Sequence, residues 1–585
     1  MKQKRNPYLV NKAFNSFLLA SILTVSASQL GSMVDGLMLS HFDGEQAMSS
    51  VNICRPVIQL LYALTVLVGA GSSMLVGVAI GNRDHVKANR IFSGVMILAF
   101  VMSVVLLVIG VTCLEPIVRS LCPEESLFGV TASYFFVTVI AAPFFMLSIM
   151  LEMFVTVDGS PKRVSLSIVA ATLVNIFLDY MFIDLFDWGV AGAAYATMIS
   201  NVVSVLFLIP HFMKKKSLKL VYHDIMPTLG KSVAEGIPFG LATMLIAVQL
   251  WGNNCVIMKY LGDIGIVALS VCMYLLEISM IILSGTLKTF QPVASILKGA
   301  GDRSGVMMTI RRAYGFMAVC FFFFVMPLIF APQYVSLLFG VSSPRYLQAA
   351  VEAIPPFSAN IILMCMLYLL LPIYQLYDNS KIATFLSVCQ SLAPTFGIWL
   401  FAEFCIDHVW WGFAFGQLFT AVCIIIISTL GVWRDKSRCP LILVPKYDDY
   451  IGFETSIEPN FSSMAEALAS ARDFFGKNGV GRDMAMHIEL TSEELINNII
   501  THGMKVGGKK RYIDYRLVLI PEGVKLILCD DARPFNPIEH KEADKIGLTI
   551  VKGMYGELKY DYIFHQNTTT SVFQDKVDQT VPALS

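Results

Sequence analysis

Long apolar segments separated by short polar ones make up most of this chain of 585 residues. Between residues 13 and 433 each segment reaches about 20 residues, the length that a helix needs to cross the hydrocarbon core of a bilayer. The pattern predicts twelve membrane helices, at 13–38, 47–80, 91–112, 132–156, 164–184, 189–212, 232–260, 264–296, 313–331, 350–375, 381–403 and 408–433. We therefore expect a polytopic all-α membrane protein over residues 1–435.

The pattern changes after Trp433. A charged linker over residues 436–452 leads into residues 453–585, which have the composition of a soluble domain. Helical periodicity and strand alternation predict, in order, helices at 461–476 and 482–503, strands at 511–520 and 523–530, a short helix near 547–555, and strands near 557–564 and 568–575. Helices beside an antiparallel sheet indicate an α+β sandwich.

Charge sets the expected orientation. The amino terminus and alternate loops are basic, for example at Arg83, Lys87 and Arg90, and again at Arg434 and Lys436. By the positive-inside rule, both termini and the C-terminal domain are expected in the cytoplasm, with the helices in the plasma membrane lipid. The 43 Lys and Arg residues balance 43 Asp and Glu residues, so no overall charge indicates a nucleic acid partner.

The membrane part repeats itself. Residues 36–84 and 256–304 share a layout, and the Gly81-Asn82-Arg83 turn matches Gly301-Asp302-Arg303 at an offset of 220 positions. Two six-helix halves, at about 10–215 and 230–435, are predicted. Such duplication is typical of secondary transporters, whose sites lie near the middle of the membrane.

Acidic and amide side chains inside these helices are candidate site residues. Asp35 lies in the first helix, Asn175 and Asp179 lie four residues apart on one helix face, and Thr197 lies in the next helix. Their oxygens suit a proton or a sodium ion, which would neutralise carboxylates that are costly at membrane depth. Two alternatives stay open: Asp179 is solvated in the loop after its helix, and Asp35 is an acid at a helix end.

The sequence assigns no site to four other charged residues in the predicted helices. Glu277 and Lys288 are eleven residues apart in one predicted helix, too far for a direct pair, so each needs another partner. Arg55 and Glu152 are expected to reach toward the headgroups.

Two runs resemble signatures of the multidrug and toxic compound extrusion (MATE) transporters. They are MVDGLMLSHFDGEQAMSSVNICRPV and NIFLDYMFIDLFDWGVAGAAYATMIS, and the resemblance extends over roughly residues 10–435. It implies a cation-coupled antiporter that exports cationic or amphipathic organic compounds. It also implies that Asp35, Asn175, Asp179 and Thr197 form the cation site. In the second half only Glu277 is a possible counterpart of the acids of another branch, so coupling is expected in the first half.

Polar residues of the C-terminal domain form three groups. Glu494, Asn498 and His502 follow one another at intervals of four on a predicted helix, where an Asn oxygen can complete a Mg²⁺ shell and a Glu can orient a nucleophile. Asp530 ends a strand and can accept a hydrogen bond from a base amine. Gly547 begins a helix, where backbone N–H groups can bind phosphate.

In this order the groups resemble the GHKL (Bergerat-type, histidine-kinase-like) ATP-binding fold, and especially the anti-sigma-factor serine kinases. The resemblance implies ATP and Mg²⁺ as cofactors, with Glu494 as catalytic base, Asn498 as the magnesium ligand, Asp530 at adenine and Gly547 in the lid. It also implies a regulatory protein partner or dimerisation through this domain. Ala532 and the Asp544-Lys545 pair depart from the glycines of the family pattern.

Three functions are consistent with the sequence. The first is an ion-driven exporter with a nucleotide-binding regulatory domain. The second is a membrane-anchored signalling protein whose C-terminal domain is a serine kinase. An ATP-driven pump is disfavoured, because the chain lacks a G-x-x-x-x-G-K-[ST] phosphate-binding loop.

Overall fold

A computed structural model describes residues 5–42, 44–121, 125–213, 218–339, 341, 343–445, 451–503, 511–521, 523–534, 536 and 558–574. The chain forms two compact units. One is Ser16–Pro445, and the other combines Met1–Asn15 with Lys446–Ser585. The sequence pattern did not anticipate that the first fifteen residues pack with the C-terminal unit.

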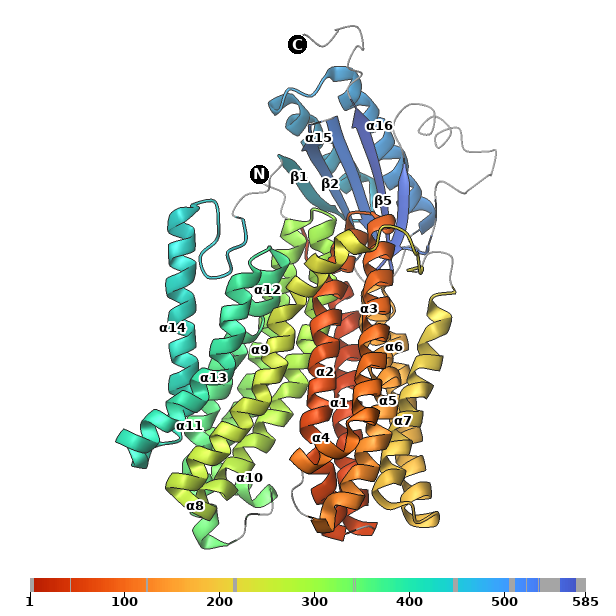
Figure 1. The fold of residues 1–585 in the computed structure, drawn as a ribbon. Helices are drawn as coiled ribbons and strands as arrows, with labels where there is room; N and C mark the ends of the chain where they lie inside the picture. The colour runs from red at the N-terminus through yellow and green to blue at the C-terminus, as the bar shows by residue number, and fades with distance from the viewer. Residues whose placement is uncertain are drawn as a thin grey trace, which may run out of the picture. The chain divides into compact units, whose positions relative to one another are not determined.

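The unit Ser16–Pro445 is helical (Figure 1). Its main helices are α1 (Tyr8–Phe42, which begins in the other unit), α2 (Gly44–Gly81), α3 (His85–Thr112), α5 (Glu125–Val157), α6 (Pro161–Asp179), α7 (Gly189–Leu208), α8 (Met226–Gly299), α9 (Arg303–Phe330), α11 (Pro344–Tyr368), α13 (Ser380–Phe404) and α14 (Trp411–Arg434). Short helices α4 (Leu114–Leu121), α10 (Pro332–Leu338) and α12 (Leu370–Leu376) lie between them.

Eleven helices within the described ranges are long and apolar enough to cross a membrane. One of them, α8, has 74 residues and includes a non-helical residue, Gly262, with φ 63°. At 1.5 Å per residue its length allows two crossings. The parts on either side of Gly262 correspond to the two spans predicted at 232–260 and 264–296.

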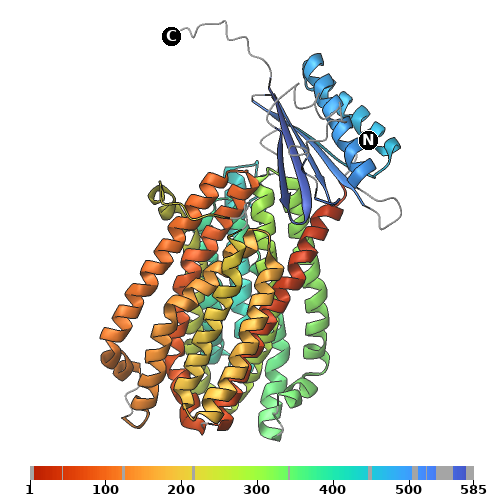
Figure 2. The same ribbon diagram turned by 90° about the vertical axis from the view of Figure 1, so that its right-hand side faces the viewer.

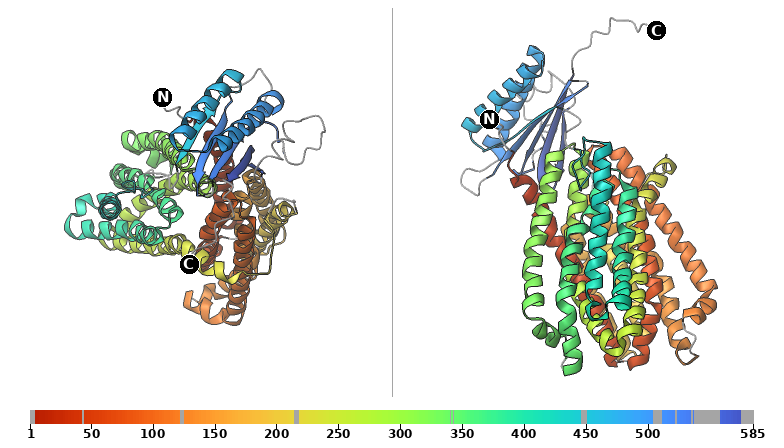
Figure 3. Two further views of the ribbon diagram at one scale, coloured as in Figure 1. Left: turned by 90° about the horizontal axis from the view of Figure 1, so that it is seen from above. Right: turned by 90° about the vertical axis from the view of Figure 1, so that its left-hand side faces the viewer.

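The two halves meet where α2 crosses α8, and seen from above their helices form two groups (Figure 3). A Cβ placed on Gly81 would lie 2.0 Å from the carbonyl oxygen of Ile296, and a Cβ on Gly299 would lie 2.0 Å from that of Val78. The contacts are reciprocal, because Ile296 follows Val78 by 218 positions, as Gly299 follows Gly81. Reciprocal contacts arise on a two-fold axis, so a pseudo-two-fold axis passes through this crossing.

The structure corrects the register of the repeat from 220 to 218 positions. Asp84 and Asp302 are equivalent, since each caps the next helix by accepting a hydrogen bond from a backbone N–H three residues later. The preceding residue of each turn is left-handed, with φ 61° at Arg83 and 65° at Gly301. The sequence match aligned Gly81 with Gly301. In the structure Gly301 corresponds instead to Arg83, which has the same left-handed backbone.

In the C-terminal unit, the described residues form a five-stranded antiparallel sheet in the order β1-β2-β3-β5-β4. Its elements are β1 (Gly452–Ile457), α15 (Phe461–Lys477), α16 (Arg482–Asn498), the π-helical turn η4 (Ile499–Gly503), β2 (Ile513–Ile520), β3 (Gly523–Asp530), β4 (Lys559–Ile563) and β5 (Gln566–Gln574). Strand β1 was not predicted; it begins at the last residue of the predicted linker. The helix predicted near 547–555 lies outside the described residues.

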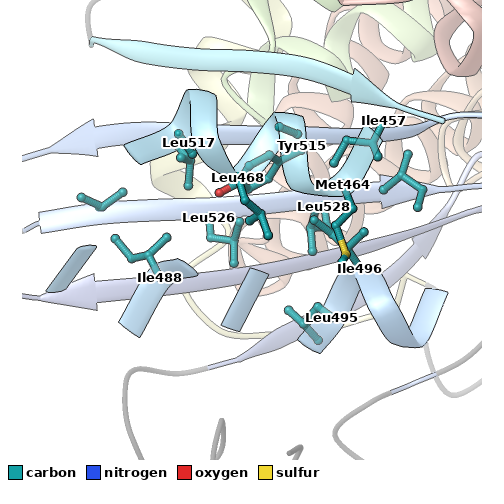
Figure 4. Close-up of a cluster of buried hydrophobic side chains, with 14 of the residues drawn as sticks. Ile457, Met464, Leu468, Ile488, Leu495, Ile496, Tyr515, Leu517, Leu526 and Leu528 are labelled. Carbon is teal, nitrogen blue, oxygen red and sulfur yellow. The ribbon is translucent and has the colours of Figure 1, made fainter. Parts of the chain in front are cut away.

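Alternate strand residues point toward α15 and α16 and form the core of this unit (Figure 4). Because successive side chains of a strand point to opposite faces, Tyr515 and Leu517 of β2 face the helices. They pack with Leu526 and Leu528 of β3 and with side chains of the two helices, including Met464, Leu468, Ile488, Leu495 and Ile496. The same alternation directs Asp514 and Arg516 to the other face of the sheet.

Candidate functional site

Asp179 is the last residue of α6, and a π-helical turn, η1 (Tyr180–Leu185), follows it at once. Such turns are frequent at functional sites, because the wider helix leaves the regular hydrogen-bond ladder. Asn175 lies one turn earlier on the same helix. Asp179 is 0% exposed and Asn175 is 6% exposed, so the alternative of solvation in the following loop does not describe Asp179.

The carboxyl groups of Asp35 on α1 and Asp179 on α6 face each other closely enough to interact. Both oxygens of Asp179, one oxygen of Asp35 and the amide nitrogen of Asn175 are buried without a hydrogen-bond partner among the described residues. Buried polar atoms of this kind are costly. A cation or a shared proton between the carboxyls would remove the cost.

Tyr134 of α5 also belongs to this group, since its side chain interacts electrostatically with both Asp35 and Asp179. Sequence reasoning missed it, because one tyrosine in an apolar helix gives no signal. Thr197 of α7 behaves differently: it is exposed, and its carbonyl oxygen accepts from Ser200 and Asn201. Within the described parts of the chain, no recorded contact joins Thr197 to either carboxyl.

The two halves also interact electrostatically, through Glu152 of α5 and Lys288 of α8. A Cβ on Gly77 would contact both Ser295 of α8 and Val157 of α5, which fixes these three at one level. Glu152 precedes Val157 by five residues on α5, and Lys288 precedes Ser295 by seven residues on α8. Glu152 therefore supplies Lys288 with an opposite formal charge within electrostatic range, and the reach of Glu152 toward the headgroups stays a prediction.

In the C-terminal unit, Asn498 Nδ2 donates a hydrogen bond to Glu494 Oε1 at 2.9 Å. Both lie on α16, which ends at Asn498 before the π-helical turn η4. Asn498 Oδ1 makes no hydrogen bond to the described residues. The four-residue spacing expected for Glu494, Asn498 and His502 therefore holds for the first two and is interrupted before the third.

Asp530 ends β3 and is 3% exposed. Its Oδ1 accepts hydrogen bonds from Asn567 Nδ2 and from the backbone N–H of Ala532, both at 2.8 Å. Its Oδ2 has no hydrogen bond within the described ranges. Burial raises the pKa of this carboxyl to about 6, against the opposing effect of the two hydrogen bonds. Asn567, which orients Asp530, was missed because it is 37 residues away in sequence.

Ala532 departs from the glycine of the GHKL pattern but uses only its backbone to hold Asp530. Its methyl group is buried in the core of the unit. The expected lid residues Asp544, Lys545 and Gly547 lie outside the described residues.

The paired bundles, the axis through α2 and α8 and the buried acids define a polytopic membrane protein with the build of a secondary transporter. Residues 20–181 match the family model MatE. The multidrug export protein MepA of Staphylococcus saprophyticus is 24% identical over 300 residues, which cover 50% of this chain and 66% of that protein. MepA of Staphylococcus aureus strain MRSA252 is 22% identical over 315 residues, which cover 53% and 70%.

Solved structures have the same fold. An outward-facing conformation of a multidrug resistance MATE family transporter of the MOP superfamily gives a TM-score of 0.67 at 20% identity, over 74% of this chain and 99% of that chain. The helical unit thus has the fold of MATE transporters, and residues 20–181 resemble the MATE family; within the described residues a C-terminal α+β unit is present in addition. The matched region spans about two thirds of the S. saprophyticus relative.

Proposed function

We propose that this protein is a cation-coupled antiporter that exports small cationic or amphipathic organic compounds across the plasma membrane. The observation that carries the proposal is the interacting pair Asp35 and Asp179. One oxygen of Asp35 and both oxygens of Asp179 are buried without a hydrogen-bond partner among the described residues. Such a pair favours uptake of a proton or a sodium ion, and its release would accompany substrate exchange. The names of the MepA relatives, multidrug export proteins, support an organic substrate.

The α2–α8 crossing supports transport by alternating access, in which the two halves rock about a central site. The crossing lies beside the basic turns after Gly81 and Gly299. The positive-inside rule predicts that these turns are cytoplasmic. We infer that this conformation is closed toward the cytoplasm and that the crossing opens once in each cycle.

Substrate efflux from proteoliposomes tests the exporter. Wild type is expected to move a fluorescent organic cation under an imposed pH gradient or sodium gradient, and the gradient that works identifies the coupling ion. Asp35→Asn and Asp179→Asn each remove one carboxylate and should lower efflux at least tenfold. The matched control is Asp184→Asn, since Asp184 is exposed. Equal efflux by all four proteins contradicts the proposal.

We further propose that residues 453–585 are a GHKL-type ATP-binding domain that regulates the transporter. Asp530 Oδ2 and Asn498 Oδ1 make no hydrogen bond to the described residues; the first suits an adenine amine and the second suits Mg²⁺. When bound, Mg·ATP would supply the phosphates to which this domain responds. Asp530 would orient the base, and Glu494 would hold Asn498 in position through their hydrogen bond.

Magnesium dependence distinguishes this site from unspecific binding. A fluorescent ATP analogue should bind the full-length protein at least tenfold more tightly with Mg²⁺ than with EDTA. Asn498→Ala should abolish that difference. The neighbouring Asn497→Ala serves as control, because Asn497 Oδ1 accepts from Thr501 instead. A magnesium effect that persists in Asn498→Ala excludes the assigned ligand.

A serine-kinase activity is the second candidate, favoured by the Glu494–Asn498 hydrogen bond, which orients a carboxylate beside the expected phosphates. Its partner would be a regulatory protein or a second copy of the domain. Glu494→Gln should keep nucleotide binding and lose phosphate transfer from labelled ATP. Deleting residues 440–585 separates the two functions: an exporter keeps its transport, whereas a signalling protein with a sensor membrane part never transports.

A further inference from the structure

One face of the C-terminal sheet is polar and yet buried. Strand alternation places Asp514 and Arg516 of β2 on the face that points away from α15 and α16, with Ser456 and Glu454 of β1 opposite them. Asp514 is 0% and Arg516 2% exposed. Buried charges require an element that covers and pairs with them. We call Glu454, Ser456, Asp514, Arg516 and Gln566 the polar face.

The chain's own amino-terminal residues cover this polar face. Arg5 Nε donates to Asp514 Oδ2 at 2.8 Å, and Arg5 also lies 3.8 Å from a carboxylate oxygen of Glu454. Arg5 is itself 8% exposed, so its guanidinium is enclosed by the contact. The backbone N–H of Asn6 donates to Ser456 Oγ at 2.8 Å. We call residues 5–12 the amino-terminal arm.

The arm also holds the residue next to Asp530. Tyr8 donates its hydroxyl to Asp531 Oδ2 at 3.0 Å, and Lys12 Nζ binds the same oxygen. The side chain of Asp531 is fully enclosed, and within the described parts of the chain its recorded counter-charge is Lys12 of the arm. Gln566 Nε2 donates to the carbonyl oxygen of Leu9 at 2.8 Å.

The arm is continuous with a membrane helix. Helix α1 runs from Tyr8 to Phe42 (Figure 2), so the residues that hold Asp531 are its first turns and Asp35 lies further along it. The first fifteen residues belong to the C-terminal unit. A movement of the arm on the polar face therefore displaces the start of the helix that carries a candidate coupling carboxyl.

We propose that the polar face is the docking surface for this chain's own amino-terminal arm, and that this docking transmits nucleotide binding at Asp530 to helix α1. The coupling rests on the nucleotide binding proposed above. The physical link is short, because Asp530 and Asp531 are adjacent carboxylates that repel each other. A ligand that engages Asp530 alters the field at Asp531, and with it the attraction of Asp531 for Lys12.

Hydrogen exchange on the full-length protein in nanodiscs tests docking first. Lys12→Glu places a negative charge against Asp531 and should speed exchange of the peptide 8–20 at least tenfold. Adding Asp531→Lys restores the attraction with the signs reversed and should recover most of the protection. Lys477→Glu is the control, because Lys477 is an exposed residue of α15. A double variant that exchanges no more slowly than Lys12→Glu alone overturns the docking.

Mg·ATP then tests coupling in the same preparation. In wild type it should protect the peptide 523–532 and change exchange of the peptide 8–20 at least threefold. Asp531→Asn leaves Asp530 intact, so it should keep the first effect and lose the second. Protection of 523–532 without any change at 8–20 in wild type overturns the coupling alone. Absence of protection at 523–532 refutes nucleotide binding and the coupling together, whereas the docking stands or falls on the charge-reversal result.

Discussion

Replacing Asp530 by asparagine should stabilise the C-terminal unit while destroying its proposed ligand site. Burial raises the pKa of Asp530 from 3.8 to about 6. A rise of about two units at 1.36 kcal/mol per unit means that keeping this carboxylate ionised at neutral pH costs about 3 kcal/mol. Asparagine retains the oxygen that accepts from Asn567 and from the backbone N–H of Ala532. Its new amide group lacks a partner among the described residues, which costs about 1–3 kcal/mol, so we expect a net gain of about 0–2 kcal/mol.

The gain should depend on pH in a defined direction. Because the folded state binds this proton more tightly than the unfolded state, wild type loses stability as pH rises from about 4 to about 6, and the loss is then constant. The stabilisation by Asp530→Asn should be absent near pH 4 and complete by pH 7. Local opening free energies of β3 and β5, measured by hydrogen exchange, report it. Asp473→Asn, at an exposed residue of α15, is the control.

The same variant should bind the nucleotide analogue poorly. A hydrogen bond to a charged group contributes about 1.5–3 kcal/mol, so its loss weakens binding about 10- to 150-fold. The explanation that burial makes this carboxylate costly to ionise would be refuted by a variant that is less stable than wild type at pH 7. It would also be refuted by a stability difference that does not change with pH. A more stable variant with unchanged nucleotide affinity would refute only the role in binding.

Nucleotide affinity of wild type should fall as pH drops below about 6, because Asp530 then becomes protonated and Oδ2 no longer accepts from the base; constant affinity between pH 5 and 7.5 contradicts this. Gly299→Ala would place a Cβ 2.0 Å from the carbonyl oxygen of Val78, which should cost about 1–3 kcal/mol and reduce efflux severalfold. Gly315→Ala, with nothing within 4 Å of the added Cβ, should leave efflux unchanged.

The membrane helices were accessible from the sequence because hydropathy is a local property. The predicted spans 232–260 and 264–296 fall on the two sides of Gly262, whose φ of 63° interrupts α8. The strands at 513–520 and 523–530 were accessible for a similar reason, since their alternation and turn are local. Contacts between residues close in sequence, such as the Glu494–Asn498 pair, could be predicted from residue type and spacing.

Contacts between distant segments could not be read in this way. Arg5 and Asp514 are 509 residues apart, and the local sequence around either residue does not predict their contact. The repeat was placed two residues out of register because composition aligned two glycines, whereas the backbone conformation aligns Arg83 with Gly301. Tyr134 and Asn567 support candidate site residues from other elements, and their residue types gave no signal.

Asp179 and Asn498 share a local feature that explains where spacing rules fail. Each is the last α-helical residue before a π-helical turn, η1 in one unit and η4 in the other. A helix places residues four apart on one face only while its hydrogen bonds run from residue i to i−4, and a π-helical turn changes this to i−5. The four-residue spacing therefore holds for Asn175 with Asp179 and for Glu494 with Asn498. It fails immediately after Asp179 and Asn498, where the π-helical turns begin. Such turns are frequent at functional sites, and here each directly follows a candidate ligand side chain.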